Sequence, residues 1–326
     1  MCNRLAAHLC LGLVLLGLTT ASEAAEKLKA VASFSILGDM VGQVGGDRVE
    51  VTTLIGPNGD AHVFSPTPAD ARTLASADIF FVSGLGFEGW MERLEKSSGF
   101  KGTAVVASKG VAPLTMEGGH HDADAGEDQE KHASEEEHDH DDHAAAETRD
   151  AETDPHAWQS LANGEIYVAN IRDGLIAADA DGRSVYEANA AKYLAVLRAE
   201  NKAAKAAIAA LPPAHRRIIT SHDAFGYFAS AYGLEVVAPE GVSTESEASA
   251  QDVAKIIRQI RKEKIPAVFL ENVTDPRLLN QITKETDAEI GGTLYSDALS
   301  DKDGPAPTYL DMFRHNIGTL TAALSS

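Results

Sequence analysis

Four side chains with metal-binding chemistry stand far apart in this chain of 326 residues: His62, His156, His222 and Asp297. Imidazole nitrogen and carboxylate oxygen both bind Zn²⁺ at about 2.0–2.2 Å, and three nitrogens with one oxygen suit its tetrahedral geometry. Each residue alone has an ordinary interpretation, because a loop histidine is often solvated and an aspartate often caps a helix or turn. A metal site therefore depends on the fold bringing them together.

The positions of these residues favour such a fold. Predicted strands span 49–55, 217–221 and 292–295, and the residues that follow them are His62, His222 and Asp297. In open parallel α/β sheets, ligands bind beyond the carboxyl ends of the strands. His156 instead follows a rigid Asp-Pro pair, where an acidic segment ends. We therefore expect four ligands to converge between two lobes, two from each lobe.

Three other residues are given no role in metal binding. His215 and His315 are predicted to lie on the surface. Glu271 also ends a predicted strand, but residues 272–275 read as a turn, so we assign Glu271 a structural role.

Alternation of strands and helices predicts an α/β fold with two doubly wound, parallel-sheet lobes. The N-terminal lobe is expected over 26–183, with strands at 28–34, 49–55, 78–82 and 103–107 and helices at 36–44, 68–76, 90–96 and 162–177. The C-terminal lobe is expected over 212–326, with strands at 217–221, 234–238, 267–270 and 292–295 and helices at 224–232, 250–264, 276–286 and 308–324.

One long, rigid helix over 184–211 is predicted to link the lobes. It has eleven alanines in 28 positions and no Gly or Pro, and Pro212 follows it. Ser184 and Glu187 form a capping-box pattern at its start. Its length would be about 42 Å. An ordinary long surface helix is the alternative, but α/β patterns on both sides favour a strut between two lobes.

Residues 1–25 are predicted to be a secretory signal peptide. Arg4 precedes an apolar run over 9–18, and small residues follow, with cleavage expected after Ala24 or Ala25. Both cysteines lie in this segment, so the mature chain offers no thiolate ligand. The net charge of −21 argues against nucleic acid or an anionic membrane surface as a partner.

Much of the negative charge lies in residues 117–153, which hold fifteen acids against two basic residues. This segment has almost no large apolar side chain, so we predict a mobile loop in the N-terminal lobe. A cluster of His138, His140 and His143 stands among its acids. We hypothesise a weaker, secondary zinc site or antenna that passes metal to the cleft or reports on the zinc supply. A solvated acidic tether is the alternative.

Four stretches of the chain together resemble a known family. They are Leu54–Asp70 around His62, Asp154–Trp158 around His156, Ser221–Phe228 around His222 and Leu294–Leu299 around Asp297. They resemble, in order, the ligand motifs of the periplasmic metal-binding components of ABC uptake systems (the ZnuA- and TroA-like group). The resemblance implies two α/β lobes, one long helix, and one metal held in the cleft by these four residues.

It also implies a periplasmic location and transient contact with an inner-membrane ABC permease. Manganese and iron members resemble this chain but carry Glu at the position of His222. We therefore expect Zn(II) as the transported ligand, since Mn²⁺ prefers more oxygen donors. A Mn(II)- or Fe(II)-binding member of the same family is the alternative. We expect a monomer, and an accessory periplasmic zinc protein is a further partner to consider.

An enzyme is not expected. Catalytic zinc has three protein ligands and an open position, whereas a fourth ligand is available here. The chain has no HExxH, GxSxG or GxxxxGK motif. An adhesin or zinc buffer is another class of function, but nothing in the sequence specifically signals it. For a carrier with a stiff linking helix, we expect only small motions on metal binding, and weaker binding as the pH falls through about 6.5.

Overall fold

A parallel four-stranded sheet forms the centre of the N-terminal lobe in the computed structural model, which describes residues 26–116, 152–241, 243–244 and 248–325. Its strand order is β2-β1-β3-β4. The strands are β1 (Leu28–Phe34), β2 (Val49–Ile55), β3 (Ile79–Val82) and β4 (Thr103–Val106). The two central strands, β1 and β3, are almost entirely buried, as parallel strands covered on both faces should be.

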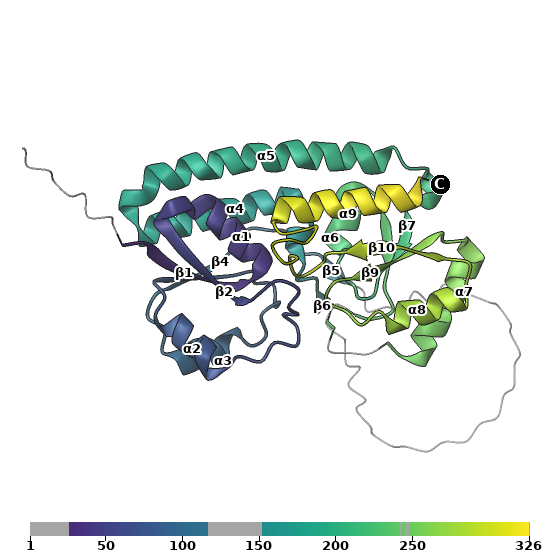
Figure 1. Ribbon diagram of the computed structural model, residues 1–326, viewed down its shortest axis with the longest axis horizontal. Helices are drawn as coiled ribbons and strands as arrows, with labels where there is room; N and C mark the ends of the chain where they lie inside the picture. The colour runs from purple at the N-terminus through teal and green to yellow at the C-terminus, as the bar shows by residue number, and fades with distance from the viewer. Residues whose placement is uncertain (1–25, 117–151, 242, 245–247, 326) are drawn as a thin grey trace, which may run out of the picture.

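Helices cover both faces of this sheet (Figure 1). They are α1 (Ser35–Gly45), α2 (Pro68–Ala75), α3 (Met91–Ser98) and α4 (Leu161–Ala178). Thr67 starts α2 with a capping box, in which its side chain and that of Asp70 each accept from the other's main-chain N–H. The cap determines where the loop that carries His62 ends.

The C-terminal lobe repeats this plan, with a parallel sheet in the order β10-β9-β7-β8. Its strands are β7 (Arg217–Ile219), β8 (Glu235–Val237), β9 (Ala267–Glu271) and β10 (Glu289–Leu294). Its helices are α6 (Gly226–Tyr232), α7 (Ala250–Glu263), α8 (Arg277–Lys284) and α9 (Tyr309–Leu324). The predicted fold class of two doubly wound lobes is confirmed.

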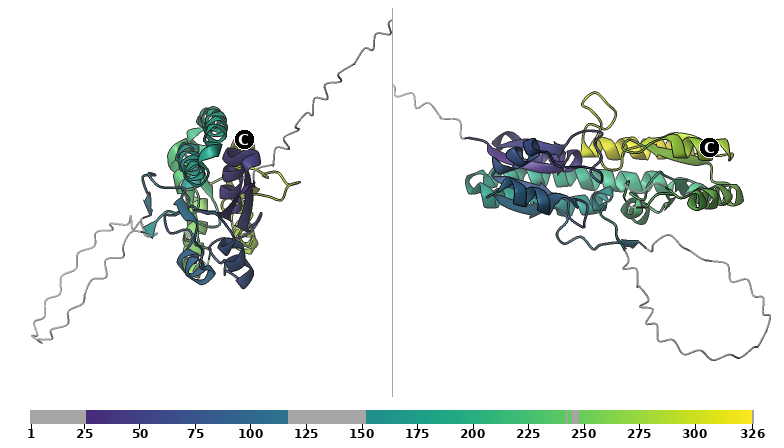
Figure 2. Two further views of the ribbon diagram at one scale, coloured as in Figure 1. Left: turned by 90° about the vertical axis from the view of Figure 1, so that its left-hand side faces the viewer. Right: turned by 90° about the horizontal axis from the view of Figure 1, so that it is seen from below.

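Helix α5 (Arg183–Ala209) runs along both lobes (Figure 1). At 27 residues it is about 40 Å long. It packs against α1 and α4 in one lobe and against α6 and α9 in the other. The right-hand view of Figure 2 shows the lobes side by side along the long axis of the molecule. The prediction of a linking strut is confirmed.

The predicted capping box at the start of α5 is wrong. A 3₁₀ turn over Ala180–Gly182 runs directly into the helix, so Ser184 lies inside it and makes no cap. Asp179 caps the 3₁₀ turn by accepting from the main-chain N–H of Gly182. The same carboxylate accepts from Arg48 and from the hydroxyl of Tyr186.

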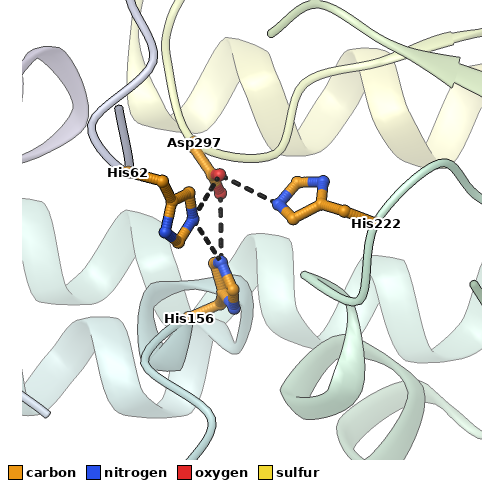
Figure 3. A group of neighbouring side chains, drawn as sticks. All are labelled: His62, His156, His222 and Asp297. Carbon is orange, nitrogen blue, oxygen red and sulfur yellow. Dashed lines mark hydrogen bonds and ion pairs between the residues drawn. The ribbon is translucent and has the colours of Figure 1, made fainter. Parts of the chain in front are cut away.

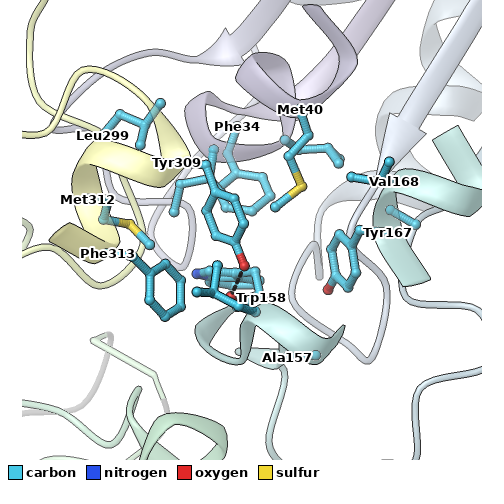
Figure 4. Close-up of a cluster of buried hydrophobic side chains, with 14 of the residues drawn as sticks. Phe34, Met40, Ala157, Trp158, Tyr167, Val168, Leu299, Tyr309, Met312 and Phe313 are labelled. Carbon is cyan, nitrogen blue, oxygen red and sulfur yellow. Dashed lines mark hydrogen bonds between the residues drawn. The ribbon is translucent and has the colours of Figure 1, made fainter. Parts of the chain in front are cut away.

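A shared core joins the two lobes (Figure 4). Phe34 at the end of β1 packs on Trp158, with ring centroids 4.9 Å apart. Tyr309 of α9 donates its hydroxyl proton to the main-chain oxygen of Trp158, and its ring packs on Phe313. The aromatic layer therefore continues from one lobe into the other.

Two short antiparallel strands, β5 (Thr115–Met116) and β6 (Glu152–Thr153), flank the His- and acid-rich segment. The predicted signal peptide over 1–25 lies outside the described residues. So do the histidines of the hypothesised secondary site: His138, His140 and His143. Within the described ranges, no helix is both long and apolar enough to cross a membrane.

Candidate metal centre

The structure brings together the four residues selected from the sequence (Figure 3). One ligand atom from each of His62, His156, His222 and Asp297 lies within 4.8 Å of the others. Nε2 of His62 is 3.3 Å from Nε2 of His156. The carboxylate of Asp297 lies 3.2, 3.6 and 3.0 Å from Nε2 of the three histidines in chain order. Four tetrahedral ligands at 2.0–2.2 Å from an ion are roughly 3.3–3.6 Å apart, close to these separations.

Each lobe supplies two of the four side chains. His62 stands in the loop between β2 and α2, and His156 follows β6 and precedes a short 3₁₀ turn. His222 lies in the loop after β7, and Asp297 in the loop after β10. Three of them therefore lie beyond the carboxyl ends of parallel strands, where open α/β sheets bind their ligands.

A buried carboxylate orients His156. Oδ1 of Asp154 is 2.9 Å from Nδ1 of His156 and accepts a hydrogen bond from its main-chain N–H at 2.9 Å. A proton held on Nδ1 leaves Nε2, the nitrogen that faces the other three residues, free to bind a cation. The sequence indicates only that Asp154 belongs to a rigid Asp-Pro pair beside His156.

Glu271 plays the same part for His222, so its interpretation as only structural was incomplete. Its Oε1 accepts from the main-chain N–H groups of Ser221 and His222. Its Oε2 lies 2.8 Å from Nδ1 of His222, at ion-pair distance but without a well-directed hydrogen bond. Glu271 ends β9, which is next to β7 in the sheet, and this strand order is not visible in the sequence.

Electrostatics at the centre are dominated by buried, opposite charges. Burial opposes charge on His222, but the carboxylates of Glu271 and Asp297 outweigh it and raise the pKa of His222 well above its usual value. Burial likewise opposes charge on Asp297, but His156 and His222 hold the pKa of Asp297 well below its usual value. A proton on His222 therefore occupies the place that a cation would take.

An unsatisfied acceptor also points to a cation. Oδ1 of Asp297 is buried and has no hydrogen-bond partner among the described residues. A buried carboxylate oxygen without a partner is costly, and a bound cation would satisfy it.

Of the four proposed ligands, His62 is the one that solvent reaches. The other three side chains are fully buried, whereas that of His62 is 7% exposed. His62 lines a cavity of about 820 Å³ together with Phe87, Trp90, Arg93 and Pro155. The ring of Phe87 packs edge-on against His62, with centroids 5.1 Å apart. An ion entering from this cavity would meet His62 first.

The other two histidines that we considered do not reach the centre. Nδ1 of His215 lies 3.0 Å from the main-chain oxygen of Leu324, and Nε2 of His315 lies 2.9 Å from that of Thr293. The sequence predicts both on the surface, but the structure shows both partly buried. Each ring is used in packing α9 or its end against the C-terminal lobe.

Comparison with known proteins agrees with this arrangement. Residues 30–323 match the family model described as zinc-uptake complex component A, periplasmic (ZnuA). The chain belongs to the ZnuA family. As a family member it is a metal-binding, solute-binding protein of an ABC uptake system, and not an enzyme.

Two curated relatives align along nearly all of this ZnuA-family chain. The manganese-binding lipoprotein MntA of Halalkalibacterium halodurans is 31% identical over 94% of this chain and 92% of its own. The iron-binding protein YfeA of Yersinia pestis is 31% identical over 92% of this chain and 87% of its own.

Solved structures show the same two-lobed fold. The manganese-bound periplasmic metal-binding protein from Candidatus Liberibacter asiaticus is 30% identical, with a TM-score of 0.76 over 91% of this chain and all of that one. The periplasmic zinc-binding protein TroA from Treponema pallidum is 27% identical, with a TM-score of 0.78 over 92% of this chain and all of that one.

Proposed function

We propose that this protein captures Zn²⁺ with His62, His156, His222 and Asp297 and delivers it to an ABC permease. The observation that supports this most directly is the set of donors, in which one ligand atom from each of three imidazoles and one carboxylate lies within 4.8 Å of the others. Zinc favours this nitrogen-rich, four-coordinate arrangement, whereas manganese favours more oxygen. The periplasmic description of the family supports export, as the predicted signal peptide does.

Manganese or iron is the second candidate cargo. Its support comes from the relatives, since those aligned above are named for manganese and iron. Asp297 adds a structural argument, because Oδ2 faces His62 and His222 while Oδ1 faces His156. A carboxylate that bound through both oxygens would add an oxygen donor and suit a larger coordination number. The donor chemistry and the relatives' names thus favour different metals.

Metal titration of the protein without its predicted signal peptide tests this proposal. After removal of metal with a chelator, calorimetry should show one tight site that prefers Zn²⁺ to Mn²⁺. His222→Ala removes a proposed ligand and should weaken zinc binding beyond the roughly 10- to 100-fold that loss of a supporting residue costs. His315→Ala, which changes a histidine outside the centre, is the control and should bind as the wild type does.

Two results would contradict the zinc proposal. Tighter binding of Mn²⁺ than of Zn²⁺ in direct competition would favour the second candidate cargo. Undiminished zinc affinity in His222→Ala would place the site elsewhere in the chain.

A further inference from the structure

His62 is held in position differently from the other two histidines of the centre. Buried carboxylates lie 2.9 Å from Nδ1 of His156 and 2.8 Å from Nδ1 of His222. His62 is held through its main chain, because its N–H donates to Oδ1 of Asp60 at 2.9 Å. The position of His62 therefore depends on what holds Asp60.

Asp60 is held by the opposite lobe. The hydroxyl of Thr244 donates to Oδ2 of Asp60 at 2.7 Å. Thr244 belongs to the connection between β8 and α7 of the C-terminal lobe, whereas Asp60 follows β2 of the N-terminal lobe. One carboxylate thus connects the main chain of a proposed ligand to the facing lobe through two hydrogen bonds.

A second anchor holds the same loop two residues earlier. The main-chain N–H of Asn58 donates to the oxygen of Leu299 at 2.9 Å, and its side chain donates to Asp301 at 3.1 Å. Asn58 has a left-handed backbone (φ 54°), which Asn tolerates better than most residues. With this end of the loop fixed, the contact of Asp60 with Thr244 determines the position of the part nearest His62.

The contact also lies beside the access route. His62 and Ser243, the residue before Thr244, line the same cavity of about 820 Å³. His62 is the only partly exposed member of the proposed ligand set among the described residues. An ion leaving toward this cavity must part from His62, so the rate of that step depends on how firmly His62 is held.

We propose that Asp60 and Thr244 are positioning residues that hold His62 at coordinating distance across the two lobes and so slow metal release. The inference rests on the proposed function, since it assumes that His62 is a ligand. Separation of the lobes at this contact removes the support of Asp60 and loosens His62, whereas His156 and His222 keep the carboxylates beside their rings.

Release kinetics test the proposal. Zinc-loaded protein is mixed rapidly with excess chelator, and the release rate is compared between the wild type, Thr244→Val and Thr244→Ser. Valine keeps the shape but removes the donor, and loss of one hydrogen bond should speed release roughly three- to tenfold. Serine keeps the donor and should release at the wild-type rate. Thr321→Val, which removes a hydroxyl bonded within α9, is the control and should also match the wild type.

A double-mutant cycle separates positioning from a general loss of stability. In a His62→Ala background, Thr244→Val should leave the release rate unchanged, because the residue through which it acts is gone. Asp60→Ala, which removes both hydrogen bonds, should release faster than Thr244→Val. Thermal unfolding of each metal-free variant confirms that it folds.

The outcomes distinguish this inference from the proposed function. If the wild type holds zinc but Thr244→Val releases it at the wild-type rate, the positioning role is wrong. An equal acceleration with and without His62 would assign the effect to stability instead. If the wild type binds no metal at the centre, the proposed function itself fails.

Discussion

His222 lies between two buried carboxylates, and this determines how the centre responds to pH. Its pKa is raised in the metal-free protein, so the ring carries a proton at pH values above its ordinary pKa of about 6.5. A proton and a metal ion compete for Nε2. Metal affinity should therefore keep rising with pH above 6.5, until the pH passes the raised pKa. The sequence alone predicted this dependence at about 6.5, without the upward shift.

We predict that zinc binding near neutral pH releases the His222 proton, and that Glu271→Gln reduces this release. The substitution removes one of the carboxylates that raise the pKa of His222. An amide facing Nδ1 would also favour the tautomer with its proton on Nε2, where metal must bind. Affinity should fall by roughly 10- to 100-fold.

Calorimetry in buffers with different ionisation enthalpies measures the number of protons released. Glu289→Gln, at an exposed position on β10, removes the same charge away from the centre and serves as the control. Equal proton release by Glu271→Gln and the wild type would contradict the role given to Glu271.

The same raised pKa predicts different effects of pH on the metal-free and the zinc-bound protein. In the metal-free form, the protonated ring of His222 stabilises the fold at pH values below the unfolded-state pKa of about 6.5. This stabilisation should be lost as the pH rises through the raised, folded-state pKa. Zinc-bound protein should change little in stability over this range, because the tighter binding offsets the loss from the unprotonated ring. Melting temperatures of both forms across this range test the expectation, and parallel trends would contradict it.

The sequence predicted the proposed ligands but not the residues that support them. Strand ends and local motifs select His62, His222 and Asp297, because ligand positions in α/β sheets follow from chain order. Glu271 supports His222 from the neighbouring strand, and Thr244 supports Asp60 from the other lobe. Those pairings depend on sheet order and lobe packing, which no local pattern of residues shows.

At the scale of the elements, α5 connects the two lobes, each of which carries one pair of the proposed ligands. Its buried face includes Tyr186, Leu197 and Ile208 and packs against helices of both lobes. The sequence predicted this helix from its composition. Its predicted capping box is wrong, because a 3₁₀ turn capped by Asp179 runs directly into the helix and leaves Ser184 inside it.

We predict that Ala199→Pro lowers both stability and metal affinity, whereas Ala199→Gly lowers stability alone. Ala199 is exposed near the middle of α5, so neither change disturbs the core directly. Proline removes a helix hydrogen bond and kinks the axis, at a cost of about 3 kcal/mol, while glycine costs about 1 kcal/mol. Only the kink would change the separation of the lobes.

Urea unfolding and zinc titration of the two variants test this prediction. Unchanged zinc affinity in Ala199→Pro, in a variant destabilised as expected, would show that α5 does not determine the geometry of the centre.

In the molecule as a whole, the lobes are less independent than the sequence suggested. The sequence divided the chain at 184–211 into two lobes and a link. The structure shows that Phe34, Trp158 and Tyr309 form one aromatic layer across the division. These contacts join residues more than a hundred positions apart, so the local patterns that predicted the strands could not reveal them.

Such a shared core predicts that zinc binding causes only small, local motion. Wide opening of the lobes would expose the aromatic layer around Trp158 to water and separate α5 from one of its two sets of partners. Release of the His62 loop, by contrast, needs only a few hydrogen bonds to break.

Solution scattering should therefore show the radius of gyration changing by less than about 1 Å on adding zinc, as for other preorganised binding sites. The comparison should be repeated with residues 118–147 deleted, so that this segment cannot contribute to the difference. A decrease of several ångströms in the protein without residues 118–147 would show that the lobes close as hinged bodies and that α5 bends or moves as they do.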